Sequence, residues 1–182
     1  MIPTISITYD RGDFINRPVL VGFCGPIGVG KSTLAHELSD STGGVVMSFA
    51  DPLRAMVSQI VDKTYLSSDI IDGVRAKDVE IPWLGFPEQT TGRKLLQLCG
   101  TDFGREMIDP DIWVKVAERR LGQYLPHTHV FIDDLRFDNE AEMVRSMGGF
   151  VVDIKRDGVA VSEDAHVSEK GVSPHLINGD FI

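Results

Sequence analysis

The sequence predicts an α/β protein of three layers, in which a central parallel sheet is flanked by helices. Short apolar runs such as "VLVGFC" at residues 19–24 recur along the chain, and they suit strands that are buried on both faces. Segments in which apolar residues follow a helical spacing stand between these runs. This alternation is typical of parallel strands that are joined by right-handed helical crossovers.

In chain order, the strand at residues 19–24 leads into a glycine-rich loop and a helix that begins at Lys31. Apolar residues at helical spacing give this helix one buried face: Leu34, Ala35 and Leu38. The Gly43–Gly44 pair ends it. A second buried strand is expected at residues 45–50, and Pro52 suits the first turn of a helix that runs to about residue 61.

From about residue 63 to residue 92 the chain is mixed and polar, and an irregular insertion of this length is more often a functional lid or substrate loop than scaffold. The alternation then resumes. We expect helices at residues 94–107, 111–121 and 138–147, and strands at residues 129–134 and 150–156. Residues 4–9, "TISITY", are a candidate edge strand.

Length and composition indicate one soluble, globular domain over residues 1–182. No apolar run approaches the ~20 residues that span a bilayer, and the opening residues lack a secretory signal, so we expect a cytoplasmic protein without a membrane partner. The net charge of -9 disfavours direct nucleic-acid binding. Cys24 and Cys99 stand far apart among apolar neighbours, which favours buried free thiols.

A phosphate-binding motif lies at residues 25–33, because "GPIGVGKST" matches GxxxxGK[ST] in full and stands between a buried strand and an amphipathic helix. Backbone N–H groups of such a loop turn towards phosphates, and the helix start adds partial positive charge. We expect Lys31 to reach the β- and γ-phosphates of ATP and the Ser32 hydroxyl to ligate Mg²⁺. The candidates for ATP binding are Gly25, Ile27, Gly28, Val29, Gly30, Lys31, Ser32 and Thr33.

Carboxylates follow two expected strands at the sheet edge where open α/β proteins bind ligands. One of Asp133 and Asp134 is expected to serve Mg²⁺, although an aspartate after a strand also caps turns. Asp51 is placed to orient or deprotonate an acceptor group or to help hold the metal, and it fits equally well as a helix N-cap before Pro52. Asp138 is expected to be the N-cap of its helix.

Polar residues on the expected helix at residues 94–107 and just before it suit a phosphorylated acceptor. Arg93 and Arg105 offer planar forks for phosphate, as does Arg54 one turn after Asp51. Gln97 and Thr101 offer neutral groups of the kind that contact a base edge. Trp113 has the helical spacing of a core residue, and an aromatic stacking platform is the alternative.

The chain resembles the deoxynucleoside monophosphate kinases of bacteriophages over most of residues 19–180. Five segments occur in the order seen in that family: "GPIGVGKST", "FADPLR", "LLQLCGTDFGRE…DIW", "FIDDLRFDNEAE" and "HVSE…LINGD". The combination of QxxGTxxxR with DxRFxNE is the specific part. The resemblance implies the P-loop kinase fold and Mg²⁺-assisted in-line transfer of the ATP γ-phosphoryl group to a deoxynucleoside monophosphate.

The resemblance also implies roles by position. It assigns residues 25–33 to ATP and the following residues to the acceptor side: Asp51, Arg93, Gln97, Arg105 and Trp113. The DxRFxNE element comprises Asp134, Arg136, Asn139 and Glu140. Arg136 is its candidate for neutralising the transferring phosphoryl group, and it joins Lys31 and Asp51 as a candidate catalytic residue. The HxSE motif comprises His166, Ser168 and Glu169, and the chemistry of these residues indicates no role.

The insertion departs from the pattern of nucleotide kinases, whose lids usually carry several arginines. Between residues 63 and 89 its cations are only Lys63, Arg75 and Lys77, so Arg136 and Arg156 are alternative sources of positive charge.

Three other functions fit the glycine loop, one of them a binding module that senses ATP without chemistry. A P-loop kinase for another small acceptor, such as dephospho-coenzyme A or phosphomevalonate, would share the fold and a "FADPLR"-like segment. A nucleotide-dependent switch of the GTPase kind would show an NKxD motif, which the sequence lacks. The sequence is compatible with a homodimer, and it carries no motif that selects among the four bases.

Overall fold

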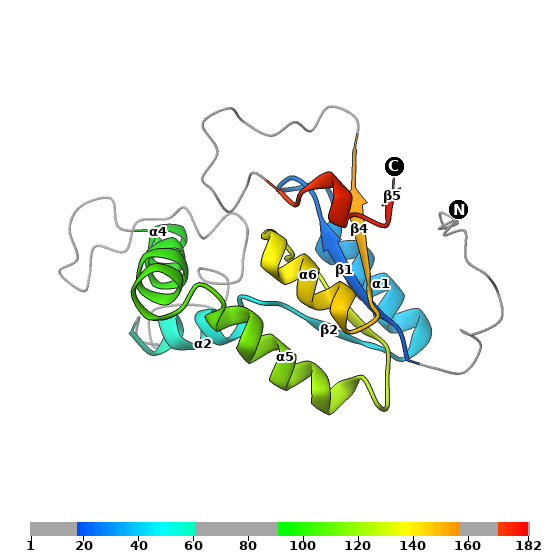
Figure 1. Cartoon of the computed structure of the whole chain (residues 1–182), viewed down its shortest axis with the longest axis horizontal. Coiled ribbons are helices and arrows are strands. Elements are labelled where there is room, and N and C mark those ends of the chain that lie inside the picture. The colour runs from blue at the N-terminus through cyan, green and yellow to red at the C-terminus, as the bar shows by residue number, and fades with distance from the viewer. Residues whose placement is uncertain (1–17, 61–90, 157–170, 182) are drawn as a thin grey trace. The chain divides into compact units, whose positions relative to one another are not determined.

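The computed structural model describes residues 18–60, 91–156 and 171–181 (Figure 1). The chain divides into two compact units, one comprising Met1–Ser48 and Val116–Ile182 and the other Phe49–Lys115. The two units are described in turn. The single domain that we expect over residues 1–182 stays a prediction.

A five-stranded parallel sheet forms the centre of the first unit (Figure 1). Its strands lie in the spatial order β2 (Val45–Met47), β3 (Val130–Ile132), β1 (Leu20–Cys24), β4 (Phe150–Ile154) and β5 (Gly179–Phe181). Every neighbouring pair is parallel. The α/β class with a parallel sheet is therefore confirmed, and β1, which leads into the glycine loop, is the central strand.

Helices cover both faces of this sheet. Val21 and Phe23 of β1 pack in one apolar cluster with Ala35 of α1 (Lys31–Thr42). Gly22 faces the opposite side, where a Cβ atom would come within 3.5 Å of Val144 on α6 (Asp138–Ser146). The two helices lie to either side of β1 in the view of Figure 1. The unit thus has the expected three layers.

The strands are shorter than the sequence predicts. β2 ends at Met47 and β3 at Ile132, and the next residues, Ser48 and Asp133, contact each other through their side chains. The end of α1 agrees with expectation, since Gly43 adopts φ 70° and its N–H group donates to Ser39 O.

Asp138 is not the N-cap of α6, so that prediction is wrong. The helix begins at Asp138 itself, and Phe137 occupies the cap position. Glu140 Oε2 accepts the N–H groups of Arg136 and Phe137, at 2.8 and 3.1 Å, which serves the helix start in place of a cap. The Asp138 carboxylate instead accepts the N–H and the hydroxyl of Ser173, and these bonds lower its pKa.

The second unit is helical in its described part. It contains α2 (Asp51–Ile60), α4 (Gly92–Gln97), a π-helix η3 (Leu98–Ile108) and the first residues of α5 (Ile112–Tyr124). The sequence predicted one α-helix at residues 94–107, but only its first turns are α-helical. Buried Leu53 and Val57 of α2 form the centre of a small core with side chains from α4, η3 and α5: Leu95, Leu96, Cys99 and Trp113.

The carboxyl-terminal segment holds two elements that the sequence analysis missed, a 3₁₀ turn η5 (Pro174–Leu176) and the edge strand β5. Asn178 anchors this segment to β4, because its N–H donates to Val151 O at 2.8 Å and its Oδ1 accepts Val151 N–H at 2.9 Å.

Several expected features lie outside the described residues: the candidate edge strand at 4–9, residues 63–90 of the insertion, and the HxSE residues 166, 168 and 169. Among the helices that are described, none has the length and apolarity needed to cross a bilayer.

Candidate active site

The phosphate-binding loop joins β1 to α1. Gly25, Gly28 and Gly30 adopt φ of 123°, 79° and 109°, a region that favours glycine. Gly25 is also closely packed, because a Cβ atom there would lie 2.4 Å from Ile154 O. Val29 is buried in the core cluster of α1, which anchors the loop from within. The loop conformation therefore depends on glycine where the motif requires it.

Lys31 is the first residue of α1, and its side chain lies along the loop. Nζ donates to Gly25 O at 2.8 Å and to Pro26 O at 2.7 Å. Burial lowers the pKa of Lys31, and the positive charge of Arg136 lowers it further, whereas Asp133 and Asp134 act in the opposite direction. Lys31, Arg136 and the two carboxylates therefore share one electrostatic environment, as expected for a site that handles phosphate.

Asp133 and Asp134 stand directly after β3, at the carboxyl end of the sheet. Asp133 is half-buried and accepts a hydrogen bond from Ser48 Oγ, with 2.5 Å between the oxygens. Asp134 is buried. Ser32 and Thr33 are exposed in the first turn of α1.

Hydroxyl and carboxylate oxygens of this kind fit Mg²⁺, which takes one or two protein ligands and keeps several waters. Among the described residues no group of three or more His, Cys, Asp and Glu side chains could form a metal cage.

The DxRFxNE element places Arg136 in the loop between β3 and α6. Glu140, whose side chain is buried, accepts the backbone N–H of Arg136 and so fixes the position of that residue. Glu140 is thus a structural member of the motif. Arg136 is half-buried and adds its charge near Lys31.

Seven of the nine candidate acceptor residues lie in the second unit, and the other two, Asp134 and Arg136, belong to the first unit. Asp51 is the first residue of α2 and accepts a hydrogen bond from Arg54 Nη1 at 3.2 Å. The remaining candidates lie on three elements, Arg93 and Gln97 on α4, Thr101 and Arg105 on η3, and Trp113 on α5. Arg105 Nη1 donates to Pro110 O at 3.1 Å. Among these candidates, Asp51 and Arg54 therefore form an ion pair with each other.

Trp113 has a structural contact in this unit. Its indole N–H donates to Gly100 O at 2.8 Å, and its ring lies so close to Gly104 that a Cβ atom there would come within 2.8 Å. These contacts agree with the core spacing of Trp113 and fix η3 against α5.

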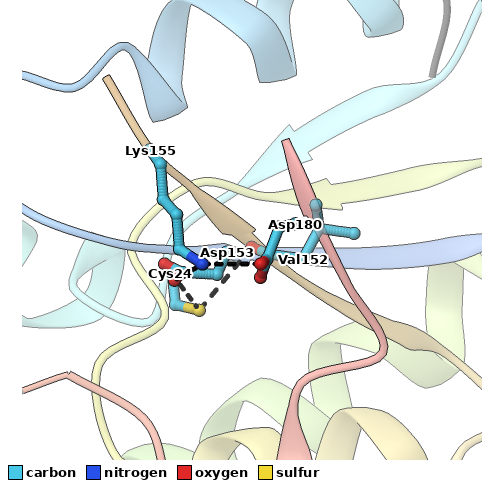
Figure 2. A network of polar contacts seen from close by, with 5 residues as sticks. All are labelled: Cys24, Val152, Asp153, Lys155 and Asp180. Carbon is cyan, nitrogen blue, oxygen red and sulfur yellow. Dashed lines mark hydrogen bonds and ion pairs between the residues drawn. The ribbon is translucent and has the colours of Figure 1, made fainter. Parts of the chain in front are cut away.

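A polar network that the sequence analysis missed joins Cys24, Asp153, Lys155 and Asp180 (Figure 2). It lies beside the first glycine of the loop, since a Cβ atom at Gly25 would lie 3.2 Å from Asp153 Oδ1. Lys155 Nζ contacts Asp180 Oδ2 of β5 at 2.5 Å and Asp153 Oδ2 of β4 at 3.8 Å. The Cys24 thiol lies 3.8 Å from Asp153 Oδ1 and 3.6 Å from Val152 O. The network connects the carboxyl-terminal strand to the end of β1.

A glycine loop after the central strand of a parallel sheet, with a lysine at the helix start and carboxylates after the neighbouring strand, defines a P-loop nucleotide-binding protein. The chain matches the deoxynucleotide monophosphate kinase family over residues 57–182. The chain belongs to this family, so it is a phosphotransferase, and the deoxynucleotide acceptor is favoured over the other small acceptors that the sequence left open.

Two relatives of the chain are named as deoxynucleotide or deoxynucleoside monophosphate kinases. The chain is 37% identical over 164 residues to a putative deoxynucleotide monophosphate kinase of Acanthamoeba polyphaga mimivirus, a match that covers 83% of this chain and 80% of the relative. It is 31% identical over 96 residues to the deoxynucleoside-5'-monophosphate kinase of Escherichia phage T5, which covers 50% of this chain and 38% of the relative. A crystal structure of TT1252 from Thermus thermophilus is 19% identical, with a TM-score of 0.38 over 80% of this chain and 75% of that one.

Proposed function

We propose that this kinase transfers the γ-phosphoryl group of ATP to a deoxynucleoside monophosphate by Mg²⁺-assisted in-line displacement, giving ADP and the deoxynucleoside diphosphate. The observation that carries the mechanism is the shared environment of Lys31, Arg136, Asp133 and Asp134 at the carboxyl edge of the sheet. Phosphoryl transfer depends on positioning and on neutralising charge far more than on covalent help from the protein.

On the donor side, the backbone of residues 25–33 holds the ATP phosphates, and Lys31 turns from the loop carbonyls to the β- and γ-phosphates. The Ser32 hydroxyl and a carboxylate of Asp133 or Asp134 would hold Mg²⁺, and the bound ion would neutralise phosphate charge. Arg136 lies on the same edge and stabilises the charge of the phosphoryl group in transfer.

On the acceptor side, we assign Arg54, Arg93 and Arg105 to the phosphate of the monophosphate. Gln97 and Thr101 contact the base edge. The phosphate oxygens of the acceptor are already largely ionised at pH 7, so orientation is the role that we assign to Asp51.

Trp113 is assigned to the acceptor side through its support of η3, where Thr101 and Arg105 lie. Asp134 is also assigned to the acceptor side, because it belongs to the DxRFxNE motif. A homodimer and a cytoplasmic location, the host's for a virus-encoded enzyme, remain proposals.

Replacement of Lys31 by Ala tests the donor side of this mechanism. We expect kcat to fall by roughly a thousandfold or more, because one preorganised cation at the transferring group is lost. ADP release that depends on a deoxynucleoside monophosphate measures the effect, and circular dichroism checks the fold. Lys115→Ala is the control, because Lys115 forms a surface ion pair with Asp109. Wild-type turnover in Lys31→Ala would refute the proposed mechanism.

Arg136→Ala tests the division between binding and transfer. We expect kcat to fall roughly a hundredfold while the affinity for ATP changes little, since the charge of Arg136 is needed chiefly during transfer. An equal loss in kcat and in ATP affinity would contradict this assignment.

A further inference from the structure

Ser48 lies opposite Asp133 at the carboxyl edge of the sheet, and the sequence gives no sign of this pairing. The register of β2 and β3 pairs Val46 with Phe131 and Met47 with Ile132, so the next residues along the two strands are Ser48 and Asp133. The backbone continues this pairing, because Asp133 N–H donates to Met47 O at 3.3 Å. The Ser48 hydroxyl then donates to Asp133 Oδ1 at 2.5 Å.

Ser48 is held firmly in this position. Ser48 is only 5% exposed. Its carbonyl oxygen accepts a hydrogen bond from Arg120 Nη1 of α5 at 3.3 Å. A donor that is itself fixed limits rotation of the carboxylate it binds, as outer partners of metal ligands commonly do. A neutral hydroxyl also leaves the negative charge of Asp133 in place, whereas a lysine or arginine would neutralise that charge.

We propose that Ser48 is a positioning residue that orients the Asp133 carboxylate towards the metal of the Mg²⁺–ATP complex. The inference rests on the proposed function, because it presupposes that Asp133 serves the metal. Asp133 is therefore assigned as the metal carboxylate in preference to Asp134, because the strand register places Asp133 opposite Ser48, whose hydroxyl holds its carboxylate.

The decisive experiment measures binding rather than turnover. Isothermal titration with the non-hydrolysable analogue AMP-PNP, in the presence of Mg²⁺ and then of EDTA, gives the factor by which the metal strengthens nucleotide binding. We expect Ser48→Ala to reduce this factor roughly tenfold without changing the affinity in EDTA, because loss of an outer partner typically costs about 10- to 100-fold in metal affinity. Ser48→Thr, which keeps the hydroxyl, should retain the factor.

Three further variants make the result specific. Ser39→Ala also removes a serine hydroxyl that is bonded to a carbonyl, that of Gly44 at 2.8 Å, and should leave the factor unchanged. Asp133→Asn should reduce the factor by itself. The double variant Ser48→Ala with Asp133→Asn should be no worse than Asp133→Asn alone, because Ser48 acts through that carboxylate. Thermal denaturation of each variant checks that it folds.

The outcomes distinguish the proposed metal role of Asp133 from the proposed positioning role of Ser48. If Asp133→Asn leaves the metal-dependent factor unchanged, the role of Asp133 fails and the role of Ser48 fails with it. If Asp133→Asn reduces the factor but Ser48→Ala does not, or if their effects add in the double variant, the metal site stands and the inference about Ser48 is overturned.

Discussion

Cys24 is a residue whose surroundings determine its chemistry. Its thiol is buried at the end of β1, beside Asp153. Burial raises the pKa of this thiol to about 12, and the neighbouring carboxylate adds to the effect. Cys99 on η3 is half-buried, and burial raises its pKa as well. Both cysteines are free, as the sequence predicted.

This difference predicts selective alkylation. Thiolate is the reactive form, and Cys24 is both protonated and shielded, so N-ethylmaleimide at pH 8 should modify Cys99 at least roughly tenfold faster than Cys24. Mass spectrometry of peptides from a time course measures the two rates. In denaturant the rates should converge. Equal rates in the folded protein would show that the described surroundings of Cys24 are wrong.

The positions of single residues were predictable where a local motif defines them, and their roles stay predictions. Lys31 and the loop glycines lie within one short pattern, and the structure places them as that pattern requires. Ser48 was missed because its partner, Asp133, lies 85 positions away and a lone serine carries no signal. Asp138 was assigned wrongly because aspartate is common at helix starts, whereas here Ser173 of a distant segment binds its carboxylate.

At the scale of elements, η3 is the least expected part of the fold. It is an eleven-residue π-helix that carries most of the QxxGTxxxR motif, whereas π-helical geometry is usually confined to single turns and often occurs at functional sites. Gly104 O accepts the N–H of Asp109 at 3.0 Å where this helix ends. The absence of a side chain at Gly104 lets the Trp113 ring approach, which fixes η3 beside α5.

Two glycine substitutions test this packing. Gly104→Ala should destabilise the fold by about 1–3 kcal/mol, because the new methyl group meets the rigid Trp113 ring. Gly122→Ala is the matched control, since a Cβ atom at this position of α5 meets no atom within 4 Å, and it should stabilise the fold by about 0.5–1 kcal/mol. Thermal denaturation followed by circular dichroism gives both values. A neutral Gly104→Ala would contradict the close contact with Trp113.

The order and type of most elements could be predicted from hydrophobic patterns, whereas the ends of several strands could not. The apolar run at residues 45–50 suggested a long strand, but β2 ends at Met47, and the Ser48 side chain that follows binds Asp133. β5 was missed because its three residues include a glycine and an aspartate and offer no apolar run. The π-helix was missed because apolar spacing within one short segment does not separate it from an α-helix.

At the scale of the whole molecule, the strand order determines where the donor side forms. The order β2-β3-β1-β4-β5 places the end of β1 beside the end of β3, so the glycine loop and the aspartates meet at one edge of the sheet. The sequence predicted the edge but not the order, which depends on contacts between distant segments. Most candidate acceptor residues lie in the second unit, and their proposed roles come from the motif and the family.

The measurement that tests the central claim most directly is ADP release with ATP and Mg²⁺, with dAMP, dCMP, dGMP and dTMP offered one at a time. Ribonucleoside monophosphates and a reaction without acceptor are the controls. A deoxynucleoside monophosphate kinase should release ADP only with an acceptor, and one or more of the four deoxynucleotides should support it. Release that is independent of the acceptor, or no release with any of the four, would contradict the account.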